Sequence, residues 1–341
     1  MHSLSNDWEN PHIVGINKLQ GRATGVPYAD VETALKRDPT SSPWVRDLNG
    51  EWVFKLVANP TESPHEFWRP DYNTSGWGVI PVPSNWNMQG HDKSIYTNVQ
   101  MPIPNTPPCV PKDDNPTGLY RKKFDMPVDW DGRTIIISFG GVDSAFYLWV
   151  NGQEVGYSQG SRLPAEFDIT DCVEPGENLI AAQVIRWSDG SFLEDQDHWR
   201  MAGIYRDVMV FALPSTYIWD VFAKPKLDSE YRDAELTVTA KIHGEMERAA
   251  GFQVEVQLYD EKMEPVFSET VSAKVVADPN ELLKATIRQE VAAPEKWNHE
   301  KPYLYILVLA LKNHDGMALQ YFSHRIGFRS VEIKNRELLV N

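Results

Sequence analysis

From about Trp44 onward, short apolar runs alternate along the chain with clusters of Gly, Pro, Asn and Asp residues. This pattern is typical of an all-β sandwich or barrel, because strands are short and each ends at a turn. Residues 134–139 and 146–150 predict buried strands, and the second runs into Asn151-Gly152, a strong hairpin signal. Further strands are expected over residues 154–157, 179–187 and 207–211.

The last third of the chain shows a cleaner period of two. Apolar residues alternate with polar ones over 236–242 and again over 252–258, which predicts strands with one buried face. Two more strands are expected on either side of Asp315-Gly316, and this spacing fits an immunoglobulin-like or fibronectin-like sandwich. The only short helix candidate is 281–284.

Tryptophan content changes sharply along the chain. Eleven of the twelve tryptophans lie at or before Trp219, which indicates two modules, and 341 residues are enough for two separate cores. We expect most of the tryptophans to belong to a wide sandwich core. The predicted organisation is an extended N-terminal arm, a first β-sandwich and an immunoglobulin-like β-sandwich, over residues 1–40, 41–214 and 215–331.

Composition excludes several classes of function. A net charge of −15 makes nucleic acid and anionic membranes poor partners. Cys109 and Cys172 make no disulfide framework, and no Cys/His spacing resembles a zinc site. The N-terminus lacks the features of a signal peptide, and no run of eighteen apolar residues occurs, so a cytoplasmic protein is expected.

Two regions could carry chemistry. Eight prolines fall within residues 81–116, and because proline removes backbone donors, this region is expected to be a long ordered loop of the kind that often carries function. The second region, residues 188–208, is dense in acids, aromatics and arginines. It contains Glu194, Asp195 and Asp197, followed by Trp199.

An aromatic face beside carboxylates is a common design for a sugar site, since the ring stacks while oxygens accept from hydroxyls. Three alternatives remain open for Asp195 and Asp197. They could lie in a solvated loop, form a structural salt bridge to Arg200 or Arg206, or supply oxygen ligands to a cation.

The same acids are poorly placed for hydrolysis within this chain. Retaining glycosidases hold two carboxylates about 5 to 5.5 Å apart across the scissile bond. Residues two apart on a strand lie roughly 7 Å apart, and adjacent residues point to opposite faces. We therefore assign no catalytic acid or nucleophile to the chain, and no nucleotide-binding fingerprint is present.

Several motifs together resemble the β-galactosidases of glycoside hydrolase family 2. They are WSDGSFLEDQDHWRMAGIYRDV at 187–208, DWENP at 7–11, LNGEW at 48–52, VPSNW at 82–86, IYTNV at 95–99, NPTG at 115–118 and VDSAFYLWVNG at 142–152. They occur in the family's order over nearly the whole chain. The EDQD run with the following WR favours the bacterial, lactose-cleaving galactosidase branch over glucuronidases and mannosidases.

The resemblance implies an architecture and two site residues. The family begins with an arm that helps to assemble a homo-oligomer, followed by a galactose-binding-domain-like jelly roll, an immunoglobulin-like domain and a (β/α)₈ barrel. By the family pattern, Asn98 and Asp197 contact galactose, and Asp197 also ligates sodium. Residues 332–341 would begin the barrel, which supplies both catalytic glutamates and the magnesium ligands.

On this resemblance, the chain is expected to be the non-catalytic N-terminal portion of a bacterial enzyme that cleaves β-galactosides such as lactose. Alone it is expected to be inactive, with no tightly bound cofactor, whereas the complete enzyme uses sodium and magnesium. Two alternatives stay open: a free-standing carbohydrate-binding module at the Trp199 and Asp197 edge, and an assembly piece that acts through the arm.

Overall fold

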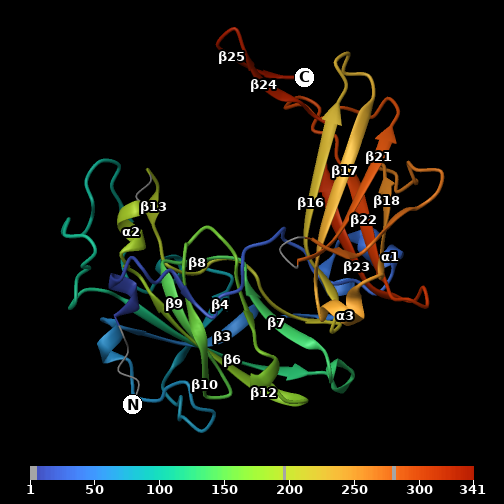
Figure 1. Cartoon of the computed structure of the whole chain (residues 1–341). Helices are drawn as coiled ribbons and strands as arrows, with labels where there is room; N and C mark the ends of the chain where they lie inside the picture. The colour runs from blue at the N-terminus through green and yellow to red at the C-terminus, as the bar shows by residue number, and fades with distance from the viewer. Residues whose placement is uncertain (1–5, 195–196, 279–281) are drawn as a thin grey trace. The chain divides into compact units, whose positions relative to one another are not determined.

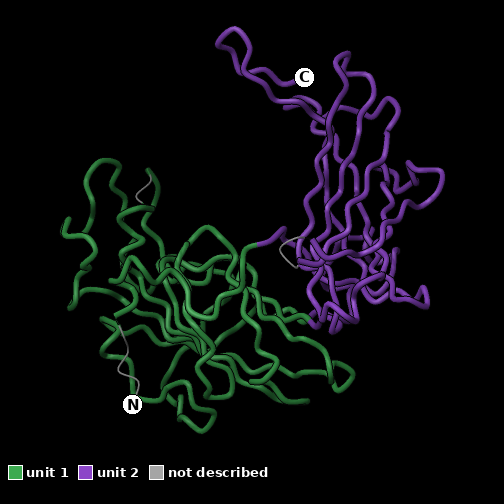
Figure 2. The backbone as a smooth tube through the Cα atoms, viewed as in Figure 1, with its two compact units in different colours: residues 1–21, 46–211 green, residues 22–45, 212–341 purple. Residues whose placement is uncertain are grey.

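The chain forms two compact units, which Figure 2 colours separately. The computed structural model describes residues 6–194, 197–278 and 282–341. The first unit comprises residues 1–21 and 46–211, and the second comprises residues 22–45 and 212–341. The segment predicted as one arm, residues 1–40, is therefore shared between the two units.

The first unit is a jelly-roll sandwich. Its larger sheet is antiparallel, with the strand order β1-β10-β9-β12-β6-β3-β4, and the smaller has the order β11-β7-β15-β2. Figure 1 labels β3, β4, β6, β9, β10 and β12 of the larger sheet and β7 of the smaller one. The larger sheet contains β1 (Gly15–Ile16), β3 (Gly50–Val57), β4 (Gly78–Val82), β6 (Thr117–Met126), β9 (Ala145–Val150), β10 (Gln153–Gln159) and β12 (Gly176–Ile185). The smaller contains β2 (Val45–Asp47), β7 (Thr134–Phe139), β11 (Ala165–Asp168) and β15 (Val208–Leu213).

Two short strand pairs complete this unit. They are β5 (Ile95–Tyr96) with β13 (Trp199–Arg200), and β8 (Val142–Asp143) with β14 (Gly203–Ile204). Residues 81–116, predicted as a long loop, are irregular over most of their length but contain β5 and the 3₁₀ turn η4 (Trp86–Gln89). The other 3₁₀ turns are η1 (Asp7–Glu9), η2 (Pro39–Ser41), η3 (Pro60–Glu62), η5 (Val128–Trp130) and η6 (Thr170–Cys172).

The hairpin predicted between β9 and β10 is confirmed. Asn151 and Gly152 take φ values of 50° and 83°, the positive region that a tight hairpin turn requires. The strands predicted from the apolar runs are likewise present as β7, β9, β10, β12 and β15.

Aromatic side chains fill the core of the first unit. Six of its tryptophans are at most 7% exposed: Trp8, Trp52, Trp86, Trp130, Trp149 and Trp187. Trp199 is 56% exposed and differs from them all. The core interpretation therefore holds for the buried six, and Trp199 needs another explanation.

The second unit is an immunoglobulin-like sandwich of two four-stranded sheets, with the orders β16-β17-β21-β20 and β19-β18-β22-β23. The first sheet contains β16 (Tyr217–Leu227), β17 (Ala234–His243), β20 (Val276–Ala277) and β21 (Leu283–Val291). The second contains β18 (Gln253–Tyr259), β19 (Val271–Lys274), β22 (Tyr305–Lys312) and β23 (Ala318–Ile326). Alternate residues of β17 and β18 are buried, as the period of two predicts.

The helix predicted over 281–284 is wrong within the described residues. Leu283 and Lys284 begin β21, where Leu283, Ala285 and Ile287 are buried in alternation with polar residues, and Glu281 lies outside the described residues. In the part of the chain that the structure describes, the short helices are α1 (Val31–Lys36), α2 (Gly190–Leu193) and α3 (Met246–Ala249). Asp30 starts α1 by accepting from the Thr33 amide at 2.7 Å, and this capping signal in the sequence was missed.

Residues 331–341 form a separate hairpin of β24 (Val331–Lys334) and β25 (Glu337–Val340). Its residues 332–341 are the segment expected to begin a barrel. Among the described residues, no helix has both the length and the apolar character needed to span a membrane.

Candidate carbohydrate-binding site

The short strands β5 and β13 bring the proline-rich loop and the acid-rich run together. Tyr96 is the Cα partner of Trp199, and Ile95 is the partner of Arg200. Because the two strands come from loops about a hundred residues apart, their pairing creates a local surface that neither loop has alone. We call this surface, made of Tyr96, Asn98, Asp197 and Trp199, the β5–β13 edge.

Tyr96 connects the two loops through its hydroxyl and its ring. Its hydroxyl donates a hydrogen bond to Oδ1 of Asp197 at 2.8 Å, and this bond and the carboxylate charge raise the pKa of Tyr96. Its ring lies 5.6 Å from the Trp199 ring, centroid to centroid, at a tilt of 42°. Both rings are about half exposed, at 50% and 56%, so an aromatic surface faces solvent beside an oriented carboxylate.

Both residues predicted to contact substrate belong to the two segments that carry β5 and β13. Asp197 is exposed and lies two residues before the start of β13. Asn98 is exposed and lies two residues after Tyr96, the last residue of β5. Asp195, another acid of the run, lies outside the described residues. The edge therefore offers an oriented carboxylate beside two exposed aromatic rings, and Asn98 supplies an exposed amide on the segment that follows β5.

A buried arginine supports the β5–β13 edge through hydrogen bonds to the backbone of both segments. Arg186 follows β12, and its side chain is only 3% exposed. It forms an ion pair with Asp92 and donates from Nη2 to the carbonyl oxygens of Lys93 at 3.0 Å and Arg200 at 2.9 Å. Burial lowers the pKa of Arg186, while Asp92 opposes that shift. One guanidinium thus joins the segments that lead into β5 and out of β13.

Asn87 makes a second tie between the same segments. Its Nδ2 donates to the carbonyl oxygen of Lys93 at 2.9 Å, and its Oδ1 accepts from the amide of Ala202 at 2.9 Å. The side chain is 8% exposed, so both hydrogen bonds are shielded from water. Together with Arg186, it fixes the spacing of the two strands.

The base of the acid-rich run is anchored on both sides of Asp197. Glu194 accepts hydrogen bonds from the Ser161 amide at 2.9 Å and from its hydroxyl. On the other side, Arg162 lies 2.9 Å from Nε2 of His198 and 2.9 Å from Oδ2 of Asp143. Glu194 therefore has a structural role, which separates it from Asp197.

Asp143 is a partly buried acid that pairs with Arg162 near the run. Burial raises its pKa, and the neighbouring Arg162 guanidinium opposes the rise. Arg206, one of the salt-bridge partners considered for the acids, donates instead to the carbonyl oxygens of Gly140 and Arg162. The partner found for Asp197 is the Tyr96 hydroxyl.

Metal-binding capacity at the edge rests on Asp197. Among residues 6–194, 197–278 and 282–341, no three His, Cys, Asp or Glu side chains gather in a way that could hold a metal ion. Hard cations prefer oxygen ligands, and a carboxylate that accepts one hydrogen bond keeps further acceptor capacity. Asp197 therefore has acceptor capacity that could supply one oxygen ligand to a cation.

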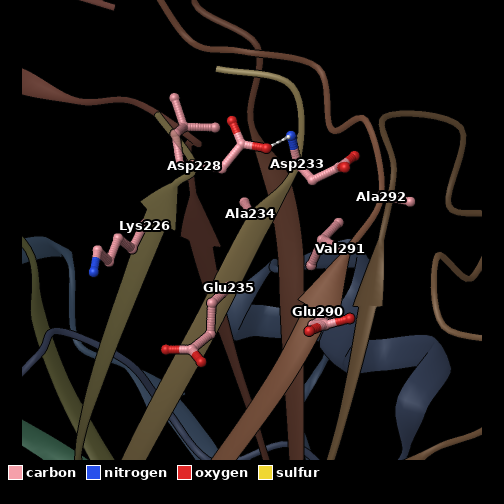
Figure 3. Close-up of a pocket in the computed structure, with 9 residues that line it drawn as sticks. Lys226, Asp228, Asp233, Ala234, Glu235, Glu290, Val291 and Ala292 are labelled. Atoms are coloured by element: carbon pink, nitrogen blue, oxygen red, sulfur yellow. Dashed lines mark hydrogen bonds between the residues drawn. The ribbon is translucent and has the colours of Figure 1, made fainter. Parts of the chain in front are cut away.

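A separate pocket of about 430 Å³ in the second unit is also lined by acidic side chains (Figure 3). Asp228 accepts from the amides of Glu230, Arg232 and Asp233, and Asp233 accepts from the amide of Ala293. These bonds lower the pKa of both carboxyls and shape the loop. Asp228 and Asp233 therefore have a structural role, because their carboxylates accept hydrogen bonds from backbone amides of the loop.

A jelly-roll sandwich with an aromatic and carboxylate edge, joined to an immunoglobulin-like sandwich, defines the class as carbohydrate-active proteins built from β modules. Residues 45–214 match the family model for the sugar binding domain of glycosyl hydrolases family 2, and residues 216–329 match a second model of that family. The chain belongs to glycoside hydrolase family 2, as the motifs predicted.

Curated relatives agree with the galactosidase branch of the resemblance. The chain is 41% identical to a β-galactosidase of Priestia megaterium and 42% identical to one of Vibrio cholerae, over 98% and 99% of its own length. It covers 33% of each relative, so it spans about a third of the length of the curated proteins it matches.

Solved structures support the fold alone. A β-glucuronidase of Bifidobacterium dentium matches 89% of the chain with a TM-score of 0.68 at 21% identity, and the chain covers 51% of it. A family 2 member from Bacteroides cellulosilyticus matches 87% of the chain with a TM-score of 0.66 at 23% identity, and the chain covers 38% of it.

Proposed function

We propose that the chain is the non-catalytic N-terminal portion of a retaining β-galactosidase that hydrolyses terminal β-galactosides such as lactose. The observation that carries the proposal is the β5–β13 edge, where the Tyr96 hydroxyl orients the Asp197 carboxylate beside an exposed aromatic surface. The curated relatives, which are named β-galactosidases and are about three times as long, support it.

In this proposal, three residues of the β5–β13 edge have a defined task. Asp197 accepts hydrogen bonds from galactose hydroxyls and ligates sodium, which adds positive charge where the sugar oxygens lie. Asn98 donates or accepts through its amide. Tyr96 holds one Asp197 oxygen, so that the carboxylate is oriented before the sugar arrives and loses less entropy on binding.

The catalytic groups, the magnesium ligands and the remaining sodium ligands are assigned to a barrel outside residues 1–341. The purified chain is therefore expected to show no metal-dependent turnover of a chromogenic galactoside. Galactose affinity is expected to be weak, on the order of several millimolar or weaker, because two polar contacts offset little of the cost of association. Turnover by the chain, or a submillimolar dissociation constant by calorimetry, would contradict the assignment.

A free-standing carbohydrate-binding module is the second candidate function, favoured by the exposure of Tyr96 and Trp199. The two candidates differ on an affinity gel that carries β-galactose. A binding module should be retained and should elute with free galactose. The non-catalytic portion of an enzyme should pass through, as should the Trp199→Ala variant of either.

The assembly role proposed for the arm needs a modified test. Residues 22–45 pack within the second unit, where Tyr28 pairs with Tyr321, so removal of residues 1–40 would also disturb a sandwich. Size-exclusion chromatography with only residues 1–6 removed keeps Trp8, which is buried in the core of the first unit, together with β1 and the second unit. A smaller oligomer would support assembly through this end, and an unchanged size would refute it.

A further inference from the structure

A groove of about 400 Å³ in the second unit has an unusual lining. The side chains that matter are Phe222, Lys224, Trp297, His324, Arg325 and Arg329, and no described Asp or Glu lines it. We call it the basic groove. It lies where β16 and β23, the outermost strands of their two sheets, pass along one side of the sandwich.

Local sequence explains why these side chains face the groove. On β16, Val221 is buried, whereas Phe222 is 64% exposed and Lys224 is exposed, as alternation in a strand requires. Trp297 donates its amide to the carbonyl oxygen of Phe328 at 2.9 Å. A side chain at Gly327 would place its Cβ 2.9 Å from Trp297 Cβ, so glycine lets the indole approach.

Among the residues that the structure describes, no carboxylate lies within ion-pair distance of Lys224, Arg325 or Arg329, although the chain has a net charge of −15. Arg329 lies over the Trp297 ring, with its guanidinium carbon 4.6 Å from the ring centroid. Like charges held together without partners destabilise a surface unless an anion joins them.

Arg37, which lies in the part of residues 22–45 that packs with this unit, adds a further positive charge. Burial lowers the pKa of Arg37, and the charge of Arg325 lowers it further. Burial and the charge of Arg37 in turn lower the pKa of His324. Within the described residues, the buried Nε of Arg37 has no hydrogen-bond partner. The positive charges of Arg37 and Arg325 therefore disfavour each other, and the charge of Arg37 disfavours protonation of His324.

We propose that the basic groove binds a small organic anion, a carboxylate or a phosphate ester, that carries a flat apolar group. The anionic group would lie among Lys224, Arg325 and Arg329, and the flat group would pack against Phe222 and Trp297. The volume suits a small molecule, since ligand sites usually measure about 300 to 1,000 Å³. Pro225 on the β16 edge lacks an amide donor, which disfavours an added peptide strand.

This inference is independent of the proposed galactoside function, because the groove and the β5–β13 edge lie in different units and share no residue. The groove also differs in chemistry, since it presents cations where the edge presents a carboxylate.

Calorimetric titration of the 341-residue chain with four probes tests the proposal. Benzoate and phenyl phosphate each combine a ring with an anion, benzyl alcohol has the ring without charge, and inorganic phosphate has charge without a ring. We expect the first two to bind with dissociation constants on the order of 1 mM. Benzyl alcohol and inorganic phosphate should each bind at least about tenfold more weakly. Whichever of benzoate and phenyl phosphate binds more tightly shows whether the groove prefers a carboxylate or a phosphate ester.

Three substitutions locate the binding. Arg325→Gln and Arg329→Gln, both at exposed positions, should each weaken benzoate binding about fivefold or more. Lys226→Gln is the matched control, because Lys226 is exposed on β16 two residues from Lys224 but does not line the groove. Its affinity should equal that of the unchanged chain.

Several outcomes would overturn the proposal. They are no binding of either aromatic anion, equal affinity for benzyl alcohol and benzoate, and unchanged affinity in both arginine variants. Tighter binding of the peptide Glu-Glu-Phe-Glu than of benzoate by more than about tenfold would also overturn it, because the groove would then be a surface for an acidic polypeptide.

Discussion

The two units each expose aromatic rings beside charged groups, but they treat the charges in opposite ways. At the β5–β13 edge of the first unit, Asp197 is held by Tyr96 and the supporting strands are held by Arg186. In the basic groove of the second unit, Arg325 and Arg329 have no acidic partner among the described residues. The β5–β13 edge is oriented before a ligand binds, whereas the basic groove carries positive charge that no acid among the described residues neutralises.

The difference separates two ways of building a site on a β-sandwich. Pre-orientation needs buried hydrogen bonds behind the exposed groups, and it reduces the entropy lost when a ligand binds. Unmatched charge needs only exposed side chains on sheet edges, and it attracts an ion of the opposite sign. Variants of the supporting residues should therefore change stability in the first unit, while variants of the groove's cations should mainly change binding.

The largest expected effect is on the support of the β5–β13 edge. Arg186→Met removes the ion-pair partner of Asp92 and a donor to the carbonyl oxygens of Lys93 and Arg200, so we expect the free energy of unfolding to fall by about 3 kcal/mol in urea denaturation. The control is Arg69→Met, because the Arg69 side chain is 51% exposed in its ion pairs. It should leave the free energy of unfolding almost unchanged, because ion pairs that water reaches are screened. A larger loss in the control would refute the supporting role of Arg186.

Packing behind the basic groove gives the next largest effect. Gly327→Ala would push its Cβ against Trp297, and we expect a loss of about 1 to 2 kcal/mol in urea denaturation, with weaker benzoate binding. Gly21→Ala is the control, since a Cβ there meets nothing within 4 Å. Equal stability of the two variants would show that Trp297 does not depend on Gly327.

Anchoring of the acid-rich run should have a smaller effect. Ser161→Ala removes the hydroxyl that donates to Glu194 but keeps the hydrogen bond from the backbone amide of residue 161 to Glu194. We therefore expect a loss of about 1 kcal/mol in the free energy of unfolding. Ser75→Ala, at an exposed loop position, should be nearly neutral. A neutral Ser161→Ala would mean that Glu194 is held by the amide alone.

The smallest effect concerns pH in the second unit. The pKa of His324 is lowered in the folded chain relative to its ordinary value of 6.5, so the unfolded chain binds the proton first as pH falls. Stability should therefore decrease as pH falls below about 6.5 toward the folded pKa. Urea denaturation of His324→Gln should lack this part of the decrease. An identical pH dependence in both proteins would rule out the lowered pKa.

The strands and both sandwiches could be predicted from local sequence, because alternation and turn residues act over a few positions. The β9–β10 hairpin needed only Asn151 and Gly152. The short helix α1 was missed although Asp30 and Thr33 carry its capping signal, since six helical residues leave little periodicity.

The sites were predictable only where their residues lie close in sequence. Asp197 and Trp199 share one run, and the family resemblance added Asn98. Tyr96 and Arg186 were not predicted, because Tyr96 contacts Asp197 from 101 positions away and Arg186 reaches Asp92 across 94. The basic groove combines β16, Trp297 and β23, and no local pattern marks it.

The central claim is that Asp197 serves galactose and sodium together. The most direct measurement is sodium-dependent hydrolysis of nitrophenyl galactoside by the complete enzyme that the proposal requires, with Asp197→Ala compared with Asp131→Ala, an exposed aspartate after η5. We predict that Asp197→Ala raises KM about tenfold or more and raises the sodium concentration for half-activation, while Asp131→Ala changes neither. Unchanged sodium activation in Asp197→Ala would contradict the account.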